Sequence, residues 1–324
     1  MTLLSVENLT VEFPTRNGVL TAIEDVTLTV EPGEILGMVG ESGAGKSMTG
    51  AAIIGLIEPP GRIARGEIRL EGERIDNLPR EAMRRVRGRR IGAIFQDPLT
   101  SLNPVLTVGE QLIETIHTHL KLPRAEARES AIDWLRRVGI PAPEKRIDTY
   151  PHQYSGGMRQ RVVIALALCA EPRLIIADEP TTALDVSVQA QIIALLRKLC
   201  KETGASVILV THDMGVIAET ADRVAVMYAG RIVEIGPVAE VIRNPQHPYT
   251  AGLMASIPRI GPRPEVLPQI EGAMPRLNAR PQGCAFNPRC PKRIELCVRV
   301  RPDLIAAGQG AAACHLINEK EAVA

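Results

Sequence analysis

The residues from Gly40 to Ser47 read GESGAGKS, and their types and spacing are those of a loop that binds the phosphates of a nucleotide. Three glycines let the backbone curl so that successive N–H groups point at the phosphates. Lys46 supplies a positive charge, and the hydroxyl of Ser47 can bind Mg²⁺. The predicted nucleotide contacts are Gly40, Glu41, Ser42, Gly43, Ala44, Gly45, Lys46, Ser47 and the backbone N–H of Met48.

Two adjacent carboxylates, Asp178 and Glu179, follow an apolar run at 174–177 that predicts a buried strand. In open α/β sheets, ligands bind at the C-terminal ends of the strands. Asp178 is therefore placed to hold the Mg²⁺ of a bound nucleotide, directly or through water. Glu179 can orient or deprotonate the water that attacks the γ-phosphate, so the pair predicts hydrolysis of the nucleotide.

Gln96 and His212 each follow another predicted strand, and we therefore expect them at the same edge of the sheet. Gln96 can contact Mg²⁺ or the attacking water, and His212 can donate a hydrogen bond to the γ-phosphate. A single histidine at a strand end is more often structural, so the prediction for His212 depends on its neighbours. Phe13 can stack on the base or be an ordinary strand residue, and the sequence leaves both alternatives open.

Short apolar runs that predict buried strands alternate with helical stretches along the chain, at 34–39, 91–95, 174–177 and 206–210. This alternation favours an α/β core with a largely parallel sheet. Residues 3–13 and 19–30 alternate between apolar and polar types and predict antiparallel strands before the phosphate loop. The stretch 107–168 has helical periodicity, and a closing hairpin is predicted from 224–227 and 231–235.

The composition limits the classes of function that fit the chain. With 324 residues, it can hold a large domain and a smaller one. Its 38 basic and 37 acidic residues give a net charge of +1, which offers no electrostatic footprint for nucleic acid. The sequence has no apolar run long enough to span a membrane, and its N-terminal stretch alternates like a strand rather than a signal peptide. We therefore expect a cytosolic protein without a nucleic-acid partner.

Beyond residue 240 the composition changes, because prolines become dense and four of the six cysteines lie between 284 and 314. We therefore predict one domain at 1–240 and a separate C-terminal extension at 241–324. A reducing cytosol disfavours disulfides, and the cysteine spacing lacks the C-x2-C pairs of common zinc sites. The Cys290–Pro291 pair is like those in loops that ligate iron–sulfur clusters.

Six motifs occur in the order and spacing of the ATP-binding-cassette (ABC) ATPases, which the first 240 residues resemble. They are the phosphate loop, Gln96, Tyr154–Met158 (YSGGM), Leu174–Glu179, Ala183–Asp185 and His212. The SGG segment is the marker of this family and separates the chain from other phosphate-loop proteins. The resemblance implies an α/β fold with a mixed sheet core, an antiparallel β subdomain and a helical subdomain at about 100–168.

The resemblance also implies that two cassettes pair head to tail around two ATP molecules. Ser155, Gly156 and Gly157 of one chain would then face the γ-phosphate bound by the other, and Asp185 would lie at the interface. Backbone N–H groups at a helix N-terminus are suited to bind such an anion. The chain departs from the usual marker sequence LSGGQ at its first and last positions, where it has Tyr154 and Met158.

Three longer segments narrow the resemblance: FQDPLTSLNP at 95–104, YSGGMRQRVVIALAL at 154–168 and NPQHPYTAGLMASIP at 244–258. They look like the ATPase subunits of dipeptide and oligopeptide permeases, whose relatives carry nickel or glutathione. The implied partners are a second, paralogous ATPase subunit, two transmembrane permease subunits and an extracytoplasmic substrate-binding protein. The implied location is the cytoplasmic face of the cell membrane. A soluble cassette ATPase that acts on nucleic acid or the ribosome is disfavoured, because the chain has one cassette and balanced charge.

The resemblance implies three cofactors. ATP and Mg²⁺ belong to the cassette itself. Similar tails in the D-type subunits of these permeases hold a 4Fe–4S cluster, so the resemblance implies such a cluster at Cys284, Cys290, Cys297 and Cys314. Zinc and unligated thiols remain the alternatives, and a tail that senses metal or redox state is compatible with the sequence, which offers no mechanism for it.

Overall fold

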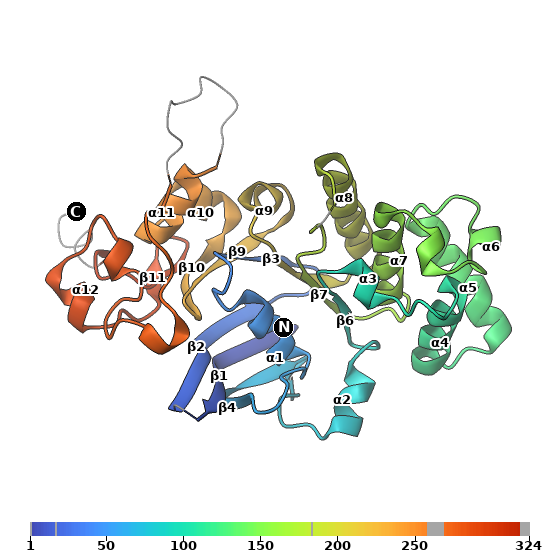
Figure 1. Ribbon diagram of the computed structural model, residues 1–324, viewed down its shortest axis with the longest axis horizontal. Coiled ribbons are helices and arrows are strands. Elements are labelled where there is room, and N and C mark those ends of the chain that lie inside the picture. Colours follow the sequence, from blue (N-terminus) through green and yellow to red (C-terminus); the bar gives the residue numbers. More distant parts are fainter. Residues whose placement is uncertain (1, 17, 183, 258–268, 318–324) are drawn as a thin grey trace. The chain divides into compact units, whose positions relative to one another are not determined.

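The computed structural model describes residues 2–16, 18–182, 184–257 and 269–317, in two compact units (Figure 1). The helical unit comprises Met1–Leu3, Val30–Ile35 and Asn77–Val210. The phosphate-loop unit comprises Leu4–Thr29, Leu36–Asp76 and Thr211–Ala324. The C-terminal extension therefore belongs to the same compact unit as the phosphate loop, and the division at residue 240 stays a prediction. Ala183 and Pro258, which belong to two of the predicted motifs, lie outside the described residues.

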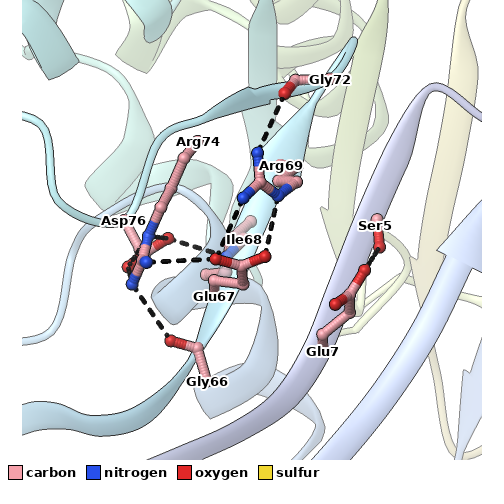
Figure 2. Close-up of polar contacts among 9 residues, drawn as sticks. All are labelled: Ser5, Glu7, Gly66, Glu67, Ile68, Arg69, Gly72, Arg74 and Asp76. Carbon is pink, nitrogen blue, oxygen red and sulfur yellow. Dashed lines mark hydrogen bonds and ion pairs between the residues drawn. The ribbon is translucent and has the colours of Figure 1, made fainter.

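A four-stranded sheet forms one part of the phosphate-loop unit. In the spatial order β2–β1–β4–β5, its strands are β2 (Gly18–Val30), β1 (Leu4–Thr15), β4 (Arg62–Leu70) and β5 (Glu73–Arg74). Strands β1 and β4 are antiparallel, with Leu4 opposite Leu70, and so are β4 and β5. Figure 2 shows that Arg74 joins Glu67, at 3.1 Å, to Asp76, at 2.9 Å, across the β4–β5 hairpin. The expected antiparallel β subdomain is confirmed.

The phosphate-loop unit also contains five strands of the second sheet, which join the strand before the phosphate loop to the C-terminal extension. In the spatial order β3–β9–β10–β12–β11, they are β3 (Ile35–Val39), β9 (Arg223–Tyr228), β10 (Arg231–Pro237), β12 (Gly310–Ala312) and β11 (Ile305–Ala307). β3 and β9 are parallel, and the other neighbours are antiparallel. The predicted closing hairpin is β9–β10, where Ala229 and Gly230 have the positive φ angles of 47° and 83° that a tight hairpin turn needs.

Aromatic packing fixes the extension to this sheet. The rings of Tyr228, Tyr249 and Phe286 are buried, with centroids 4.6–5.4 Å apart. A separate small core contains Ala307, Ala312, Cys314 and Ile317. The helices of the unit are α1 (Lys46–Ile53), α9 (Met214–Thr220), α10 (Val238–Arg243), α11 (Pro248–Ala255), α12 (Glu295–Arg299) and the 3-10 helices η2 (Leu277–Ala279) and η3 (Asn287–Arg289).

The helical unit contains three parallel strands in the spatial order β6–β7–β8, namely β6 (Ile91–Ile94), β7 (Leu174–Asp178) and β8 (Ser206–Val210). Ile94 lies opposite Ala177, and Ala177 lies opposite Leu209, so the three strands end at one edge. This agrees with the predicted α/β core. The helices are α2 (Arg80–Val86), α3 (Pro98–Ser101), α4 (Val108–Leu120), α5 (Arg124–Arg137), α6 (Pro143–Arg146), η1 (Pro151–Gln153), α7 (Gly156–Leu168) and α8 (Val186–Thr203).

Helices α4 to α7 form the helical subdomain that the resemblance implies, and they are green in Figure 1. α4 begins at a capping box, in which Glu110 N donates to Thr107 Oγ1 at 3.2 Å and Thr107 N donates to Glu110 Oε2 at 2.7 Å. Its buried face includes Val108, Leu112 and Ile116, as the helical periodicity predicts. Among the described helices, none has both the length and the apolar character needed to cross a membrane.

Candidate nucleotide-binding site

The phosphate loop connects β3 to α1 in the phosphate-loop unit, as the sequence predicts. Gly40, Gly43 and Gly45 have φ angles of 149°, 80° and 108°, which residues with side chains rarely adopt. Space also excludes a side chain at Gly45, where a Cβ would lie 2.7 Å from Ile23 Cγ2. The loop therefore has the curled backbone that presents N–H groups to an anion.

Lys46 begins α1 with its ammonium group turned back into the loop. Its Nζ donates to Gly40 O at 2.8 Å and to Glu41 O at 3.1 Å, and the residue is only 5% exposed. Ser42 and Ser47 are exposed, whereas Ala44 is buried. Lys46 is thus placed to exchange carbonyl contacts for phosphate contacts, with a hydroxyl beside it at the start of the helix.

Glu179 lies directly after β7 in the helical unit, beside Asp178, and both carboxylates are half-buried. Its backbone has a φ of 46°, unusual for a residue with a side chain, and its N–H donates to Val210 O at 2.9 Å. Glu179 Oε2 accepts hydrogen bonds from Gln96 Nε2 at 3.3 Å and from Thr182 Oγ1 at 2.9 Å. The structure therefore brings two of the predicted residues, Gln96 and Glu179, into direct contact.

Sequence reasoning missed Thr182, which fixes one oxygen of Glu179. The positive φ of Glu179 starts a turn in which Thr182 N donates to Glu179 O at 3.1 Å, and this turn carries the threonine hydroxyl to the carboxylate. The sequence signal was the two threonines at 181 and 182, directly after Glu179–Pro180.

The SGG marker segment lies at the N-terminus of α7 in the helical unit. Ser155 caps this helix, because its Oγ accepts a hydrogen bond from Met158 N at 3.4 Å. Ser155 and Gly156 are exposed and Gly157 is half-buried, so backbone N–H groups at the start of a 13-residue helix lie at the surface. Tyr154 is buried, and its hydroxyl donates to Arg146 O at 2.6 Å. Its role is thus to pack and anchor the marker.

Asp185 caps α8 in the same unit. Its Oδ1 accepts hydrogen bonds from Ser187 Oγ at 2.8 Å and from Val188 N at 3.0 Å. These bonds, first the one from Ser187, lower the pKa of the Asp185 carboxyl below its ordinary value. Asp185 is exposed, so its charged side chain lies at the surface. The start of α8 lies close to the marker helix α7, because a Cβ at Gly157 would be 2.9 Å from Val188 Cγ1.

His212 and Phe13 both belong to the phosphate-loop unit. His212 is exposed, two residues beyond the end of β8 and next to Asp213, which caps α9 by accepting from Gly215 N at 2.7 Å. Phe13 is half-buried near the end of β1. Its ring lies so close to Gly61 that a Cβ added there would be 2.5 Å from Phe13 Cε1. Packing against Gly61 gives Phe13 a role in the strand, and base stacking stays a prediction.

The C-terminal extension contacts the phosphate loop, which sequence reasoning did not foresee. Glu41 N donates to the hydroxyl of Tyr249 at 2.9 Å. Arg289 Nη1 lies 2.9 Å from Glu41 Oε1 and 3.0 Å from Oε2, and the arginine side chain is 7% exposed. Gly230 N, in the β9–β10 turn, donates to Ala44 O at 2.8 Å. Residues far apart in the sequence thus hold the phosphate loop at Glu41 and at Ala44.

The four cysteines of the extension line one small pocket, together with His247 and His315. Cys284 N donates to Cys297 O at 2.8 Å, which joins two of the cysteine segments. Burial, and then the nearby thiols of the other three cysteines, raise the pKa of Cys284 to about 11. In the described part of the chain, no three or more His, Cys, Asp or Glu side chains lie close enough to hold one metal ion. The described geometry therefore shows neither a zinc site nor an iron–sulfur site at these cysteines.

Comparisons with known proteins agree with this geometry. The ABC transporter family matches residues 23–182, and the family described as oligopeptide/dipeptide transporter, C-terminal region, matches residues 233–297. The dipeptide transport ATP-binding protein DppD of Bacillus subtilis (strain 168) is 49% identical and covers 92% of this chain and 90% of its own length. The protein of the same name from Haemophilus influenzae is 46% identical and covers 99% and 97%.

Solved structures that are similar to this chain are also ATP-binding cassettes. A dimeric, post-hydrolysis ATP-binding cassette bound to ADP and Pi has a TM-score of 0.65 at 29% identity and covers 72% of this chain and 98% of its own. For cbiO1 of Clostridium perfringens, part of the ABC transporter complex cbiONQ, the TM-score is 0.65 at 30% identity, with 75% and 91% covered. Fold and motifs thus define an ABC transporter ATPase. Within that class, the chain belongs to the family of ATP-binding subunits of dipeptide and oligopeptide transporters.

Proposed function

We propose that the chain hydrolyses ATP to drive the import of dipeptides or oligopeptides across the cell membrane. The observation that carries this proposal is the position of Glu179, whose carboxylate follows β7 and is held by Gln96 and Thr182. A carboxylate fixed in this way can orient the water that attacks the γ-phosphate. The phosphate loop, with Lys46 turned into it, supplies the complementary anion site.

The remaining residues receive roles that follow from their chemistry. The loop N–H groups and Lys46 bind the phosphates, and His212 donates a hydrogen bond to the γ-phosphate. Oxygen donors suit Mg²⁺, and the Ser47 hydroxyl, the Asp178 carboxylate and the Gln96 amide provide them. When bound, Mg²⁺ neutralises charge on the β- and γ-phosphates. Ser155, Gly156, Gly157 and Asp185 would face the ATP of a second cassette, which is supported by their position at the surface of the helical unit.

The transported solute and the partners are proposals by similarity. Relatives named for dipeptide transport and putative peptide import share 46–49% of the sequence over most of this chain, which favours peptides over nickel or glutathione. We propose a heterodimer with a paralogous ATPase subunit at the cytoplasmic face of the membrane. Two transmembrane permease subunits and an extracytoplasmic binding protein would complete the importer. The dimeric state of a similar solved cassette supports the pairing.

Transport by the reconstituted importer tests this assignment. The chain, its paralogous partner, the permease subunits and the binding protein are placed in vesicles and supplied with labelled dipeptides, tripeptides, glutathione or Ni²⁺. We expect ATP-dependent uptake of peptides. Uptake of Ni²⁺ or glutathione alone would show that the importer carries that solute rather than peptides. ATP hydrolysis without uptake of any of the four solutes would contradict the transport function and favour a soluble ATPase.

We further propose that Cys284, Cys290, Cys297 and Cys314 hold a 4Fe–4S cluster. The pocket that all four line supports this. The cluster would supply a covalent link among four segments of the extension. The names of the relatives mention no cluster, so the proposal rests on the thiols alone.

Iron and sulfide analysis of protein purified without oxygen tests the cluster. We expect four irons and four sulfides per chain, visible absorption that dithionite bleaches, and loss of both in Cys290→Ser. Stoichiometric zinc, or thiols that all react with a labelling reagent in the native protein, would contradict the proposal. The buried Cys169 and Cys200 provide the control, because Cys200→Ser should leave the iron content unchanged.

A further inference from the structure

A cavity of about 460 Å³ lies within the phosphate-loop unit, and Cys284, proposed above as a cluster ligand, is one of its lining residues. Its walls come from β2, from the β9–β10 hairpin, and from two segments of the extension at 280–286 and 301–304. In Figure 1 the extension, in orange and red, begins beside β10. Cavities of 300–1,000 Å³ are typical of small-molecule sites. The volume therefore admits an amino acid or a short peptide.

Charged side chains of both signs line this cavity in equal number: Arg231, Arg280, Arg301, Glu24, Asp25 and Asp303. Arg231 lies 3.0 Å from Asp25, Arg301 lies 2.6 Å from Glu24, and Arg280 lies 3.9 Å from Glu24. The formal charge of the lining is zero. A polyanion such as a nucleotide would meet three carboxylates here, so the lining favours a ligand that carries both a negative and a positive charge.

Arg280 is the residue that most needs a further partner. Its side chain is 15% exposed, and its Nη2 donates to Ala22 O at 3.0 Å. Its Nε is buried and has no hydrogen-bond partner among the described residues. Burial also lowers the pKa of Arg280 and of Arg231 below the ordinary arginine value, although both stay charged. An incoming carboxylate would offset the burial of the two cations.

Apolar groups form the rest of the lining. Tyr228 and Phe286 meet edge to face, with centroids 5.3 Å apart, and Ile232 and Leu304 also line the cavity. Asp303 is exposed and contributes a carboxylate opposite in charge to the neighbouring Arg231. The cavity thus offers cations for a carboxylate, carboxylates for an ammonium group, and an apolar surface for a side chain.

We propose that this cavity binds a small zwitterion, an amino acid or a dipeptide, with its carboxylate on Arg280 and Arg231 and its ammonium group near Glu24 and Asp303. Under the peptide-import function proposed above, a peptide delivered to the cytoplasm would be such a ligand. The binding site itself does not depend on that function, because it follows from the lining of the cavity.

The cavity wall is joined to the phosphate loop. Gly230 N donates to Ala44 O at 2.8 Å, and a Cβ at Gly230 would lie 2.5 Å from Arg280 Nη2. A ligand that moves Arg280 therefore acts on the turn that holds the loop. Thermodynamic linkage then requires that the ligand and ATP change each other's affinity by the same factor. We expect the affinity for ATP to change at least twofold when the cavity is filled.

Calorimetric titration of the full chain with Ala-Ala tests the site. We expect saturable binding of one dipeptide per chain. N-acetyl-Ala-Ala and Ala-Ala amide, each lacking one charge, should bind at least tenfold more weakly. Absence of binding by Ala-Ala, or equal binding of the three compounds, would overturn the proposal. Because this titration needs no transporter and no hydrolysis, its failure is distinguishable from failure of the import assay.

Two variants locate the binding. Arg280→Gln should weaken Ala-Ala binding at least tenfold, and Asp303→Asn, at an exposed position, should weaken it several-fold without affecting folding. Arg84→Gln, on the exposed face of α2 in the helical unit, is the matched control and should bind like the wild type. Full affinity in Asp303→Asn together with full affinity in folded Arg280→Gln would place the ligand elsewhere. An ATP affinity that is identical with and without saturating Ala-Ala would overturn the proposed link to the loop.

Discussion

Arg289 of the C-terminal extension pairs with Glu41 of the phosphate loop, its Nη1 lying 2.9 Å and 3.0 Å from the two carboxylate oxygens. The same guanidinium donates to the carbonyls of Glu271, at 2.8 Å, and Ile270, at 3.1 Å. Since the arginine is almost wholly buried, this is a structural contact rather than a solvated ion pair. The extension therefore bears directly on the part of the cassette that binds phosphate.

Removing this pair should weaken both the fold and nucleotide binding. Arg289→Gln leaves the Glu41 carboxylate without its counter-charge beside the incoming phosphates, so we expect ATP affinity to fall several-fold. The lost charged hydrogen bonds should lower the free energy of unfolding by about 1.5–3 kcal/mol. A double-mutant cycle with Glu41→Gln, measured by urea unfolding, isolates the coupling between the two residues. If the losses of unfolding free energy in the two single variants simply add in the double variant, Arg289 and Glu41 do not interact, which would contradict the contact described here.

Thr182 is expected to position Glu179 rather than to react. Thr182→Val removes the hydroxyl that holds Oε2 at 2.9 Å, so kcat should fall about tenfold or more while KM for ATP stays near the wild-type value. Thr182→Ser keeps the donor and should restore most of the rate. Steady-state ATPase assays of the assembled transporter measure both constants. A serine variant as slow as the valine variant would show that the hydroxyl is not the cause.

Tyr154 should stabilise the helical unit through one buried hydrogen bond. Its hydroxyl donates to Arg146 O at 2.6 Å, a carbonyl that also accepts from Thr149 N at 2.9 Å and Thr149 Oγ1 at 2.7 Å. Because this carbonyl keeps other donors, Tyr154→Phe should cost only about 0.5–1.5 kcal/mol of unfolding free energy. The exposed Tyr150→Phe is the control and should cost less than about 0.5 kcal/mol. Equal losses in the two variants would contradict the assignment.

His119 should make stability depend on pH. Burial, and then the charges of Arg89 and Arg84, lower its pKa in the folded state below the ordinary value of 6.5. The unfolded chain therefore binds a proton more readily than the folded one, so stability is full above about pH 6.5 and falls as the pH drops below it. His119 lines one pocket of the helical unit together with Arg84, Arg89, Glu81 and Glu114.

Urea unfolding between pH 5 and pH 8 measures this dependence. Relative to wild type, His119→Gln should show a shallower loss of stability on acidification, while the exposed His152→Gln should follow the wild-type curve. A wild-type slope in His119→Gln would mean that other groups carry the acid sensitivity.

The local parts of this architecture were predictable from the sequence. The spacing of the glycines predicts the phosphate loop, because residues with side chains rarely adopt its φ angles. The short apolar run before Asp178 predicts β7. Thr107 and Glu110 form the capping box at which α4 begins. Each of these signals lies within a few residues of the feature that it predicts, and so they need no knowledge of the tertiary fold.

Contacts between distant segments were not predictable in this way. Tyr249 and Arg289 lie 208 and 248 residues from Glu41, and no periodicity or spacing links such positions. The composition of the extension suggested a separate domain, because its prolines and cysteines differ from the rest of the chain. Two added strands and the cluster around Phe286 join it to the rest of the phosphate-loop unit. These contacts lie far from the compositional change in the sequence, and the boundary at residue 240 stays a prediction.

The central claim, that Glu179 carries out ATP hydrolysis, is tested most directly by Glu179→Gln in the purified transporter. This substitution keeps the shape of the side chain and removes the charge that orients or deprotonates water, so ATP binding should persist while the hydrolysis rate falls about 100-fold or more. Glu129→Gln, on the exposed face of α5, is the control and should hydrolyse ATP like the wild type. A Glu179→Gln protein that hydrolyses ATP at the wild-type rate would contradict the account.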